Sequence, residues 1–363
     1  MAAPALVGRE REYVLDCLDS TWISSCGSYV DRFEVEFATF CGVRHAIACT
    51  NGTAAVHLAL LALGLQPGDE VIVPTLTFVA SANPVRYCGA RVVLVDSESV
   101  TWNMDAQQIE AAITPRTRGI IAVHLYGHPM DMDAVLEIAE RRGLWVLEDA
   151  AEAHGAAYRG RRVGSIGRVA TFSFYGNKIL TSGEGGMVVT DDSELAARVR
   201  QLKGQGQDPQ RRYWFPVLGY NYRMTNVAAA IGLAQLERAD WHLGRRREIA
   251  EWYREELADV EGLVLSPEEH WARNAYWIFC ALLDERRFGS RDGVMAALAE
   301  AGIETRPFFF PLHTLPIYTH DRGSGGLPVA EDLGRRGINL PSSALLTRDD
   351  VARVSGQLRA LAH

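Results

Sequence analysis

Short apolar runs alternate with helical patterns from residue 45 to about residue 190, and this alternation restricts the fold more than any other feature. Runs rich in β-branched residues and separated by helices indicate a largely parallel sheet with helices on both faces. In such sheets ligands bind at the carboxyl ends of the strands. We therefore predict an α/β fold with its functional site at that edge. The runs are HAIAC (45–49), EVIVP (70–74), ARVVLVD (90–96), RGIIAVHL (118–125) and LWVLEDA (144–150).

The length of 363 residues favours two domains. A long helical pattern over 227–257 leads out of the first one. We predict a large domain over 1–240 and a smaller α+β domain over 241–363. The segments that indicate the second domain are the β-like YWIFCALL and GIETRPFFF, helical patterns near 291–301 and 348–361, and a mobile loop, THDRGSGGLP (319–328).

The composition argues against several classes of protein. A net charge of −8 is contrary to a general nucleic-acid binder. No apolar run approaches the roughly 18 residues that span a membrane. The N-terminus has no basic stretch followed by an apolar core, so we expect no signal peptide. The six cysteines form no C-x-x-C pair, which predicts reduced thiols in a cytoplasmic protein with neither a disulfide framework nor a metal site.

Lysine is scarce in this chain, and one lysine stands in a distinctive place. Of 37 cationic residues two are lysine, Lys178 and Lys203. Lys178 lies in SFYGNKILTSGEGG (173–186), between aromatic and glycine-rich stretches. Arginine stays protonated in proteins, whereas an amine can lose its proton and form an imine with an aldehyde. The pattern favours a reactive Lys178 over the alternative, a solvated surface lysine.

A carboxylate pair ends the strand in LWVLEDAAEAHGA (144–156). A cofactor with a pyridine ring needs an anion there to keep its nitrogen protonated. Strand alternation points Asp149 away from Glu148, so Asp149 is our candidate. If a helical turn begins at Asp149, Glu152 lies on the same side, and His154 is placed to orient the carboxylate. The alternative is that the acidic strand end merely caps a helix.

Two further segments suit a phosphorylated planar cofactor. In CTNGTAAVHLAL (49–60) a strand leads through Gly52 and Thr53 into an apolar helix, and a helix start favours a phosphate. Alternation along ATFSFYGNK (170–178) places Ser173 where it can donate to the same phosphate, and Phe78 follows a strand where a ring can stack. The alternatives are an ordinary strand-to-helix turn and a core phenylalanine.

Competing motifs are missing from the sequence. We find no G-x-G-x-x-G directly after a strand, no P-loop around either lysine and no H-E-x-x-H. A lysine, a strand-end aspartate and a phosphate turn at one sheet edge therefore point to pyridoxal phosphate. The aromatic and arginine-rich RRYWFPVLGYNYRMTN (211–226) suits a structured loop, a pyrophosphate contact or a subunit contact.

At these residues the chain resembles the DegT/StrS family of pyridoxal-phosphate sugar aminotransferases. The resemblance covers nearly the whole chain and implies the aspartate-aminotransferase fold, fold type I of the pyridoxal-phosphate enzymes. The matching strings are TNGTAAVHLAL (50–60), GDEVIVPTLTFVA (68–80), VHLYGHPMDMDA (123–134), EDAAEAHGA (148–156), FSFYGNKILTSGEGGMVVT (172–190) and GYNYRMTN (219–226).

The resemblance implies roles for the polar residues nearest the reaction. Lys178 matches the lysine that is covalently linked to the cofactor and moves the proton. Asp149 matches the partner of the pyridinium nitrogen. Glu152 stands where many members carry glutamine near the cofactor's phenolic oxygen, and a carboxylate there interacts differently with that oxygen.

The resemblance also implies how the cofactor is held. Gly52, Thr53 and Ser173 match phosphate contacts, and Phe78 matches the stacking ring. Asn221 matches an asparagine that reaches the phosphate in the neighbouring subunit. A homodimer with shared active sites is the expected assembly.

The reaction implied is transfer of an amino group from L-glutamate to a nucleotide-linked 4-keto-6-deoxy sugar. The strings WISSCGSYVDRFE (22–34), GQGQDPQRRYWFPVLGYNYRMTN (204–226) and RPFFFPLH (306–313) most resemble the members that form GDP-perosamine from GDP-4-keto-6-deoxymannose. Two alternatives stay open, a UDP- or dTDP-linked keto sugar and a non-catalytic regulator on the same fold.

Overall fold

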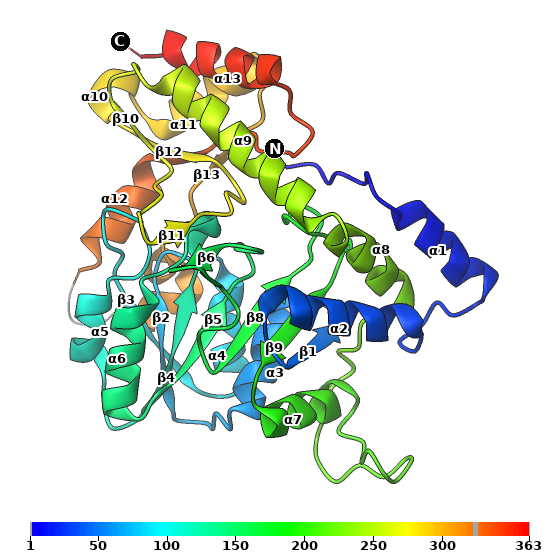
Figure 1. Cartoon of the computed structure of the whole chain (residues 1–363). Helices are drawn as coiled ribbons and strands as arrows, with labels where there is room; N and C mark the ends of the chain where they lie inside the picture. The colour runs from blue at the N-terminus through cyan, green and yellow to red at the C-terminus, as the bar shows by residue number, and fades with distance from the viewer. Residues whose placement is uncertain (1, 322–325, 363) are drawn as a thin grey trace.

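A seven-stranded sheet forms the centre of the computed structural model, which describes residues 2–321 and 326–362 (Figure 1). The strand order is β1-β9-β8-β5-β4-β2-β3. Neighbouring strands from β8 to β3 run parallel, which confirms the predicted largely parallel sheet. The strands are β1 (His45–Cys49), β2 (Glu70–Pro74), β3 (Arg91–Val95), β4 (Thr117–Val123), β5 (Trp145–Asp149), β8 (Val169–Ser173) and β9 (Gly186–Thr190).

Strand β9 is the exception, since it pairs antiparallel with both β1 and β8. The chain passes from β8 to β9 through a loop over 174–185 instead of a crossover helix. Such a direct connection joins antiparallel strands, while parallel strands need a longer crossover. This loop carries Lys178, so the break in the parallel pattern coincides with the segment singled out by the sequence.

Helices cover both faces of the sheet, as predicted. Side chains alternate along β2, where Val71 and Val73 pack with α3, α4 and α7 on one face and Ile72 packs with α5 and α6 on the other. Helices α2 and α8 pack together, and α1 packs on α8. The helices are α1 (Glu10–Asp19), α2 (Ser28–Cys41), α3 (Gly52–Ala62), α4 (Asn83–Tyr87), α5 (Ala106–Ala112), α6 (Met132–Arg142), α7 (Ser193–Lys203) and α8 (Asn226–Leu236), with the 3-10 turns η1 (Val79–Ser81) and η2 (Leu125–Gly127).

The pattern over 227–257 forms two helices instead of one, α8 and α9 (Ala239–Leu257). Helix α9 leads from α8 to a separate antiparallel sheet of order β10-β12-β14-β13 (Figure 1). A core of its own surrounds this second sheet. Its elements are β10 (Leu263–Leu265), β12 (Cys280–Leu283), β13 (Arg306–Pro307), β14 (Gly337–Asn339), α10 (Glu285–Phe288), α11 (Arg291–Glu300), α12 (Pro328–Arg336) and α13 (Arg348–Ala360), with the 3-10 turns η3 (Leu312–Thr314) and η4 (Pro316–Asp321). The centre of the expected loop over 319–328, residues 322–325, lies outside the described residues.

A three-stranded sheet joins the two parts. Strand β11 (Ala272–Arg273) pairs with β6 (Ala157–Tyr158), which pairs with β7 (Arg161–Arg162) in a hairpin. The hairpin follows the strand-end carboxylates of β5 in sequence, so the C-terminal part is tied to the segment that forms the site.

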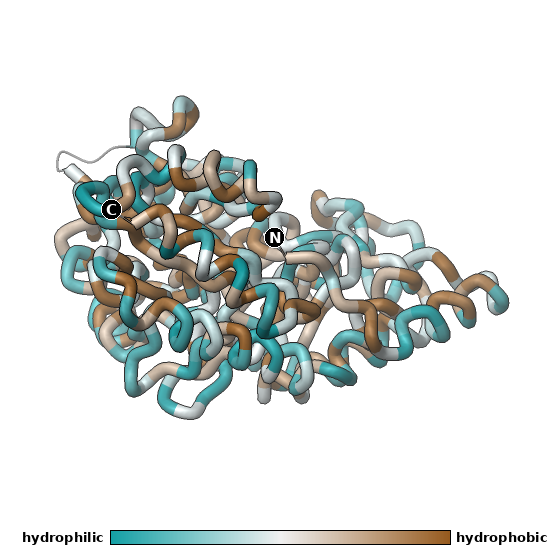
Figure 2. Tube along the Cα trace, turned by 90° about the horizontal axis from the view of Figure 1, so that it is seen from above, coloured by the Kyte–Doolittle hydropathy of each residue, from teal (hydrophilic) through white to brown (hydrophobic). Residues whose placement is uncertain are grey.

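Two segments extend from the body of the molecule. The loop between α7 and α8 reaches out beyond the large sheet (Figure 1). Seen from above, the trace tapers toward the end where α1 lies, and hydrophobic and hydrophilic stretches alternate there (Figure 2). None of the helices within the described ranges is both long and apolar enough to cross a membrane.

Candidate active site

Lys178 lies in the interior, beyond the carboxyl end of β8. Its side chain is 10% exposed, and its Nζ is 4.0 Å from Oε1 of Glu152. A separation of 4.0 Å is too long for a hydrogen bond. Within residues 2–321 and 326–362 no acceptor lies within hydrogen-bond distance of this amine. Burial contradicts the alternative of a solvated surface lysine.

Burial and neighbouring charge have opposite effects on the pKa values of Lys178 and Glu152. Burial lowers the pKa of Lys178, although the carboxylates of Glu152 and Asp149 oppose the shift. Burial raises the pKa of Glu152 to about 7, although the Lys178 ammonium opposes that shift. Glu152 also accepts the backbone N–H of Tyr126 at 2.8 Å. Burial thus moves the pKa values of the two groups toward each other, and the carboxyl of Glu152 titrates near neutral pH.

Asp149 ends β5 with its carboxylate held on both oxygens. The Ser81 hydroxyl donates to Oδ2 at 2.7 Å, and the Ala151 N–H donates to Oδ1 at 3.2 Å. The bond from Ala151 is the local contact that a helix cap makes. The bond from Ser81, in the η1 turn after β2, fixes the carboxylate from a different part of the sheet edge. Ser81 in turn contacts the Thr77 hydroxyl at 2.9 Å. The sequence gives no sign of this role for Ser81, because its partner lies 68 residues away.

Glu148 points away from Asp149, as strand alternation predicts. Its buried carboxylate meets His124 Nε2 at 3.1 Å and accepts N–H groups of Gly164, Ile166 and Gly167 at 2.7–2.8 Å. These bonds and His124 lower the pKa of Glu148 against the effect of its burial. Glu148 thus holds the segment that follows the β6–β7 hairpin, while Asp149 is left for the site.

The proposed orienting role of His154 is not supported by its contacts. The ring packs against Phe172 and Phe174 at centroid distances of 5.3 and 5.4 Å. Neither ring nitrogen has a hydrogen-bond partner among the residues described. Burial lowers the pKa of His154 to about 3, so the ring is neutral. Ser81 makes the contact to Asp149 that the sequence analysis assigned to His154.

Gly52 and Thr53 form the first turn of α3, against the end of β8. Asn51 caps the helix by accepting the Ala54 N–H at 2.8 Å. The N–H groups of the first turn have no acceptor within the helix and attract anions. A Cβ on Gly52 would lie 2.7 Å from Cβ of Ser173, so only glycine allows this approach. Ser173 and the helix start therefore lie in direct contact.

Phe78 is 53% exposed, which contradicts the alternative of a core phenylalanine. It begins a run of rings in which Phe78 faces Phe309 at 5.7 Å, Phe309 faces Tyr126 at 5.3 Å, and Tyr126 faces Trp277 at 6.4 Å. Tyr126 has a left-handed backbone with φ of 53°, and its hydroxyl accepts the Phe309 N–H at 3.0 Å. The rings connect the large sheet with the C-terminal part beside Lys178.

Trp277 is the second residue that the sequence analysis missed. The Lys178 Nζ lies 3.8 Å from the centroid of its ring. Its indole N–H donates at 2.8 Å to the carbonyl of Asn177, the residue before Lys178. Trp277 thus contacts the amine and fixes the backbone that carries it. In the sequence Trp277 belongs to a strand-like run 99 positions away, and nothing in that run points to Lys178.

The comparisons with known proteins decide the family. The profile of the DegT/DnrJ/EryC1/StrS aminotransferase family matches residues 4–359. The chain belongs to this family. Its members are aminotransferases that use pyridoxal phosphate, so this DegT/DnrJ/EryC1/StrS protein is a pyridoxal-phosphate-dependent enzyme.

Three relatives illustrate the similarity. GDP-perosamine synthase of Caulobacter vibrioides is 55% identical over 359 residues, which cover 99% of this chain and 96% of the relative. GDP-perosamine synthase of Escherichia coli O157:H7 is 50% identical, with 96% and 94% covered. The crystal structure of DesI in the presence of its TDP-sugar product superposes with a TM-score of 0.91 at 37% identity, with 99% and 93% covered. The predicted fold is thereby confirmed.

The residues of this family member fit pyridoxal phosphate. Lys178 offers a buried amine without a hydrogen-bond acceptor among the described residues, and Asp149 offers a carboxylate fixed by Ser81. Gly52 lets the first turn of α3 lie directly against Ser173, so the N–H groups of that turn and the Ser173 hydroxyl stand together. An aldehyde, a ring nitrogen and a phosphate are the groups that these three places suit.

Asn221 is the one candidate that this chain does not bring to the cluster. It is exposed at the base of the loop between α7 and α8, where its backbone bridges to Gly204. The Arg223 guanidinium donates to its side-chain oxygen at 3.4 Å. None of its contacts in the described part of the chain involves Gly52, Ser173 or Lys178.

Proposed function

We propose that this aminotransferase transfers an amino group from L-glutamate to GDP-4-keto-6-deoxymannose and so forms GDP-perosamine. The observation that carries the proposal is the identity of 55% and 50% with two GDP-perosamine synthases over more than nine tenths of each chain. DesI, whose structure was determined with a TDP-sugar product, is 37% identical. The higher sequence identity to the GDP-perosamine synthases favours a GDP-linked acceptor over a TDP-linked one.

In this proposal each side chain of the cluster has a separate task. When bound, pyridoxal phosphate supplies an aldehyde for an amine and a protonated ring that accepts electron density. Lys178 would bind that aldehyde and carry the proton at Nζ, and burial, which lowers its pKa, favours the neutral amine that this role needs. Asp149 holds a ring N–H, with its carboxylate fixed by Ser81.

The remaining candidates bind and orient the cofactor. The first turn of α3, with Gly52 and Thr53, and the Ser173 hydroxyl hold the phosphate. Phe78, which is exposed after β2, would stack on the ring. Glu152 faces Lys178, and its raised pKa would allow the carboxyl to be protonated and to donate a hydrogen bond to the phenolic oxygen of the cofactor.

We further propose a homodimer with shared active sites, in the cytoplasm. Apolar side chains are exposed on the two segments that leave the body of the molecule, α1 with its following turn and the loop between α7 and α8. Large exposed apolar patches mark protein contacts. Such a partner would bring its Asn221 to the phosphate. The residues concerned are Leu15, Leu18, Trp22, Ile23, Tyr213, Trp214, Phe215 and Leu218.

The proposal is tested with three nucleotide sugars. The purified protein is incubated with L-glutamate and GDP-4-keto-6-deoxymannose, or with the dTDP- or UDP-linked 4-keto-6-deoxy sugar, and 2-oxoglutarate is measured. We expect the GDP-linked sugar to have the highest kcat/KM. A higher kcat/KM with the dTDP- or UDP-linked sugar would identify that sugar as the acceptor instead. If no sugar gave 2-oxoglutarate, the result would favour a non-catalytic regulator.

A further inference from the structure

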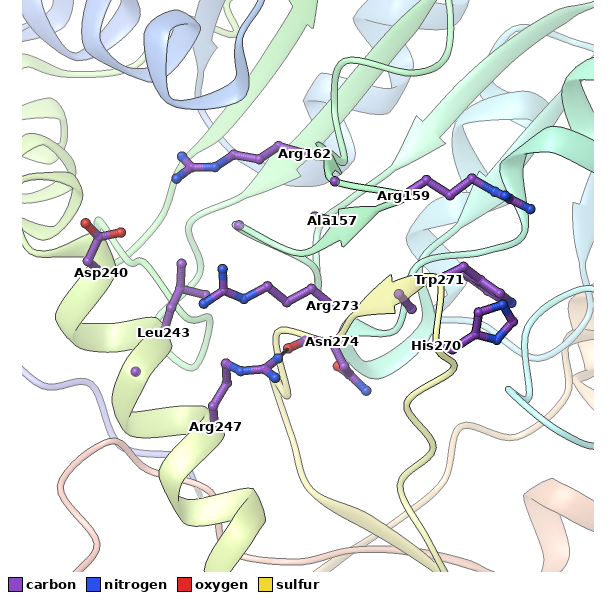
Figure 3. Close-up of a pocket in the computed structure, with 14 residues that line it drawn as sticks. Ala157, Arg159, Arg162, Asp240, Leu243, Arg247, His270, Trp271, Arg273 and Asn274 are labelled. Atoms are coloured by element: carbon purple, nitrogen blue, oxygen red, sulfur yellow. Dashed lines mark hydrogen bonds between the residues drawn. The ribbon is translucent and has the colours of Figure 1, made fainter.

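A hollow of about 570 Å³ lies outside the candidate active site. Helix α9 forms one wall, the β6–β7 hairpin the second, and residues 270–274 with β11 the third (Figure 3). None of the residues that line it belongs to the lysine and carboxylate cluster. Its volume falls within the range of about 300–1,000 Å³ of small-molecule sites.

Four arginines line this hollow, and two of them lack an anionic partner. Arg247 pairs with Glu268 at 2.8 Å, and Arg159 pairs with Asp133 at 2.9 Å. The side chain of Arg273 makes no ion pair or hydrogen bond within the described part of the chain, although its backbone pairs with Ala157 of β6.

Arg162 is held in place without being neutralised. It donates to the Phe40 carbonyl at 2.7 Å and lies 4.2 Å from the centroid of that ring. No carboxylate of the described ranges lies within 4.0 Å of it. Two uncompensated cations thus face one hollow in a chain whose net charge is −8.

The side chains of Arg162 and Arg273 extend toward the same wall of the hollow (Figure 3). In Figure 3, Arg162 and Arg273 extend from the hairpin and β11 toward α9, whereas the Arg159 side chain points in the opposite direction. Gly160 and Gly244 leave open space, because a Cβ on either would meet nothing within 4 Å. Asp240 stands on α9 as the one carboxylate among the residues described around the hollow.

We propose that this hollow binds the phosphate or pyrophosphate group of a small molecule through Arg162 and Arg273. A guanidinium presents parallel N–H donors that match two phosphate oxygens, and two guanidiniums balance the charge of a phosphate dianion. Trp271 and Leu243 line the same space and offer apolar contact to an organic substituent. The ligand is inorganic pyrophosphate or the diphosphate end of a nucleotide.

The test is calorimetric titration of the cofactor-loaded protein with inorganic pyrophosphate, GDP and guanosine. The variants are Arg273→Gln and Asp240→Asn, with Arg286→Gln as the control, because Arg286 is exposed and lies outside the hollow. We expect Arg273→Gln to weaken one binding event about tenfold or more, and Asp240→Asn to strengthen it severalfold, since it removes a repelling charge. Amino transfer is expected to stay unchanged in Arg273→Gln.

The three ligands distinguish a site for a nucleotide from a site for the inorganic anion. Tighter binding of GDP than of pyrophosphate at the Arg273-dependent site indicates a nucleotide, whereas equal binding indicates the anion alone. Guanosine is expected not to bind at this site. Identical isotherms for the wild-type protein and all three variants would overturn the proposal, as would crystals soaked in tungstate with no anomalous peak between Arg162 and Arg273.

Discussion

The Nζ of Lys178 lies 4.0 Å from a carboxylate oxygen of Glu152, and the two side chains, 10% and 5% exposed, lie between the large sheet and the C-terminal part. In this arrangement a small change of charge on either group alters the proton affinity of the other. The chemistry that we assign to the site depends on this pair.

Replacement of Lys178 by arginine separates charge from reactivity. Lys178→Arg keeps a cation but no amine that can lose its proton, so we expect turnover to fall by about 10²–10⁴-fold or more. Borohydride treatment followed by peptide mass spectrometry is expected to label Lys178 in the wild-type protein and no residue in the variant. Lys203→Arg is the matched control, and equal labelling of both variants would contradict the assignment.

The pH dependence of stability reports on Glu152. Folding raises the pKa of its carboxyl from 4.5 to about 7, so the folded protein binds this proton more tightly than the unfolded chain. The stabilisation is fully present below about pH 4.5 and is lost as the pH rises through about 7. In Glu152→Gln the Tm of the cofactor-free protein is expected to fall less over this window than in the wild-type protein.

The control for Glu152 is Glu251→Gln, at an exposed position on α9. We expect its Tm to follow the wild-type curve across the same pH range. A Glu152→Gln curve parallel to the wild-type curve would show that the carboxyl titrates at its ordinary pKa in the folded protein.

The hydroxyl of Ser81 is expected to matter through Asp149. Ser81→Ala removes a hydrogen bond of 2.7 Å to the carboxylate, and a bond to a charged group contributes about 1.5–3 kcal/mol. We expect cofactor affinity or kcat to fall by about 10–100-fold. Ser97→Ala is the matched control, because the buried Ser97 hydroxyl has no partner among the described residues. Equal effects of the two substitutions would reject a specific role for Ser81.

Trp277 is expected to act on the amine of Lys178. Trp277→Phe keeps a ring but removes the N–H that fixes Asn177, whereas Trp277→Leu removes the ring as well. Because a ring face stabilises a cation, Trp277→Leu should lower the pKa of Lys178 further. The acidic limb of the kcat/KM profile is then expected to move to lower pH in Trp277→Leu and to stay near the wild-type position in Trp277→Phe. An unshifted limb in Trp277→Leu would limit Trp277 to a structural role.

Shared active sites are tested by mixing inactive subunits. Lys178→Ala and Asn221→Ala are each expected to be inactive, and a mixed dimer contains one site with both wild-type residues. Activity should therefore return after the two variants are unfolded and refolded together. If the mixture stays inactive while mixed dimers are detected by native mass spectrometry, the site belongs to a single chain.

The sequence was most informative where the site residues are local to a strand end. Asp149, Gly52 and Ser173 follow or end strands of one sheet, so strand order alone placed them at the same edge. The positions of Ser81 and Trp277 depend on contacts over 68 and 99 residues, which no periodic pattern encodes. The interior position of His154 depends on how three phenylalanines pack around it, which composition does not determine.

The boundaries of helices were likewise hard to predict where they depend on packing between distant segments. The helical pattern over 227–257 continues through residues 237–238, where the chain bends into a second helix with a different packing surface. We propose that the two domains meet there, near residue 240, since Ala239 packs with the large sheet and Ile249 with the C-terminal core.

The most direct test of the proposed reaction follows the nitrogen atom. The cofactor-loaded protein is incubated with ¹⁵N-labelled L-glutamate and GDP-4-keto-6-deoxymannose, and the nucleotide sugar is analysed by mass spectrometry and NMR. We expect one ¹⁵N atom on carbon 4 of the sugar in the wild-type reaction and none in the Lys178→Ala reaction. An unlabelled sugar with the wild-type protein, or a label that persists without Lys178, would contradict the account.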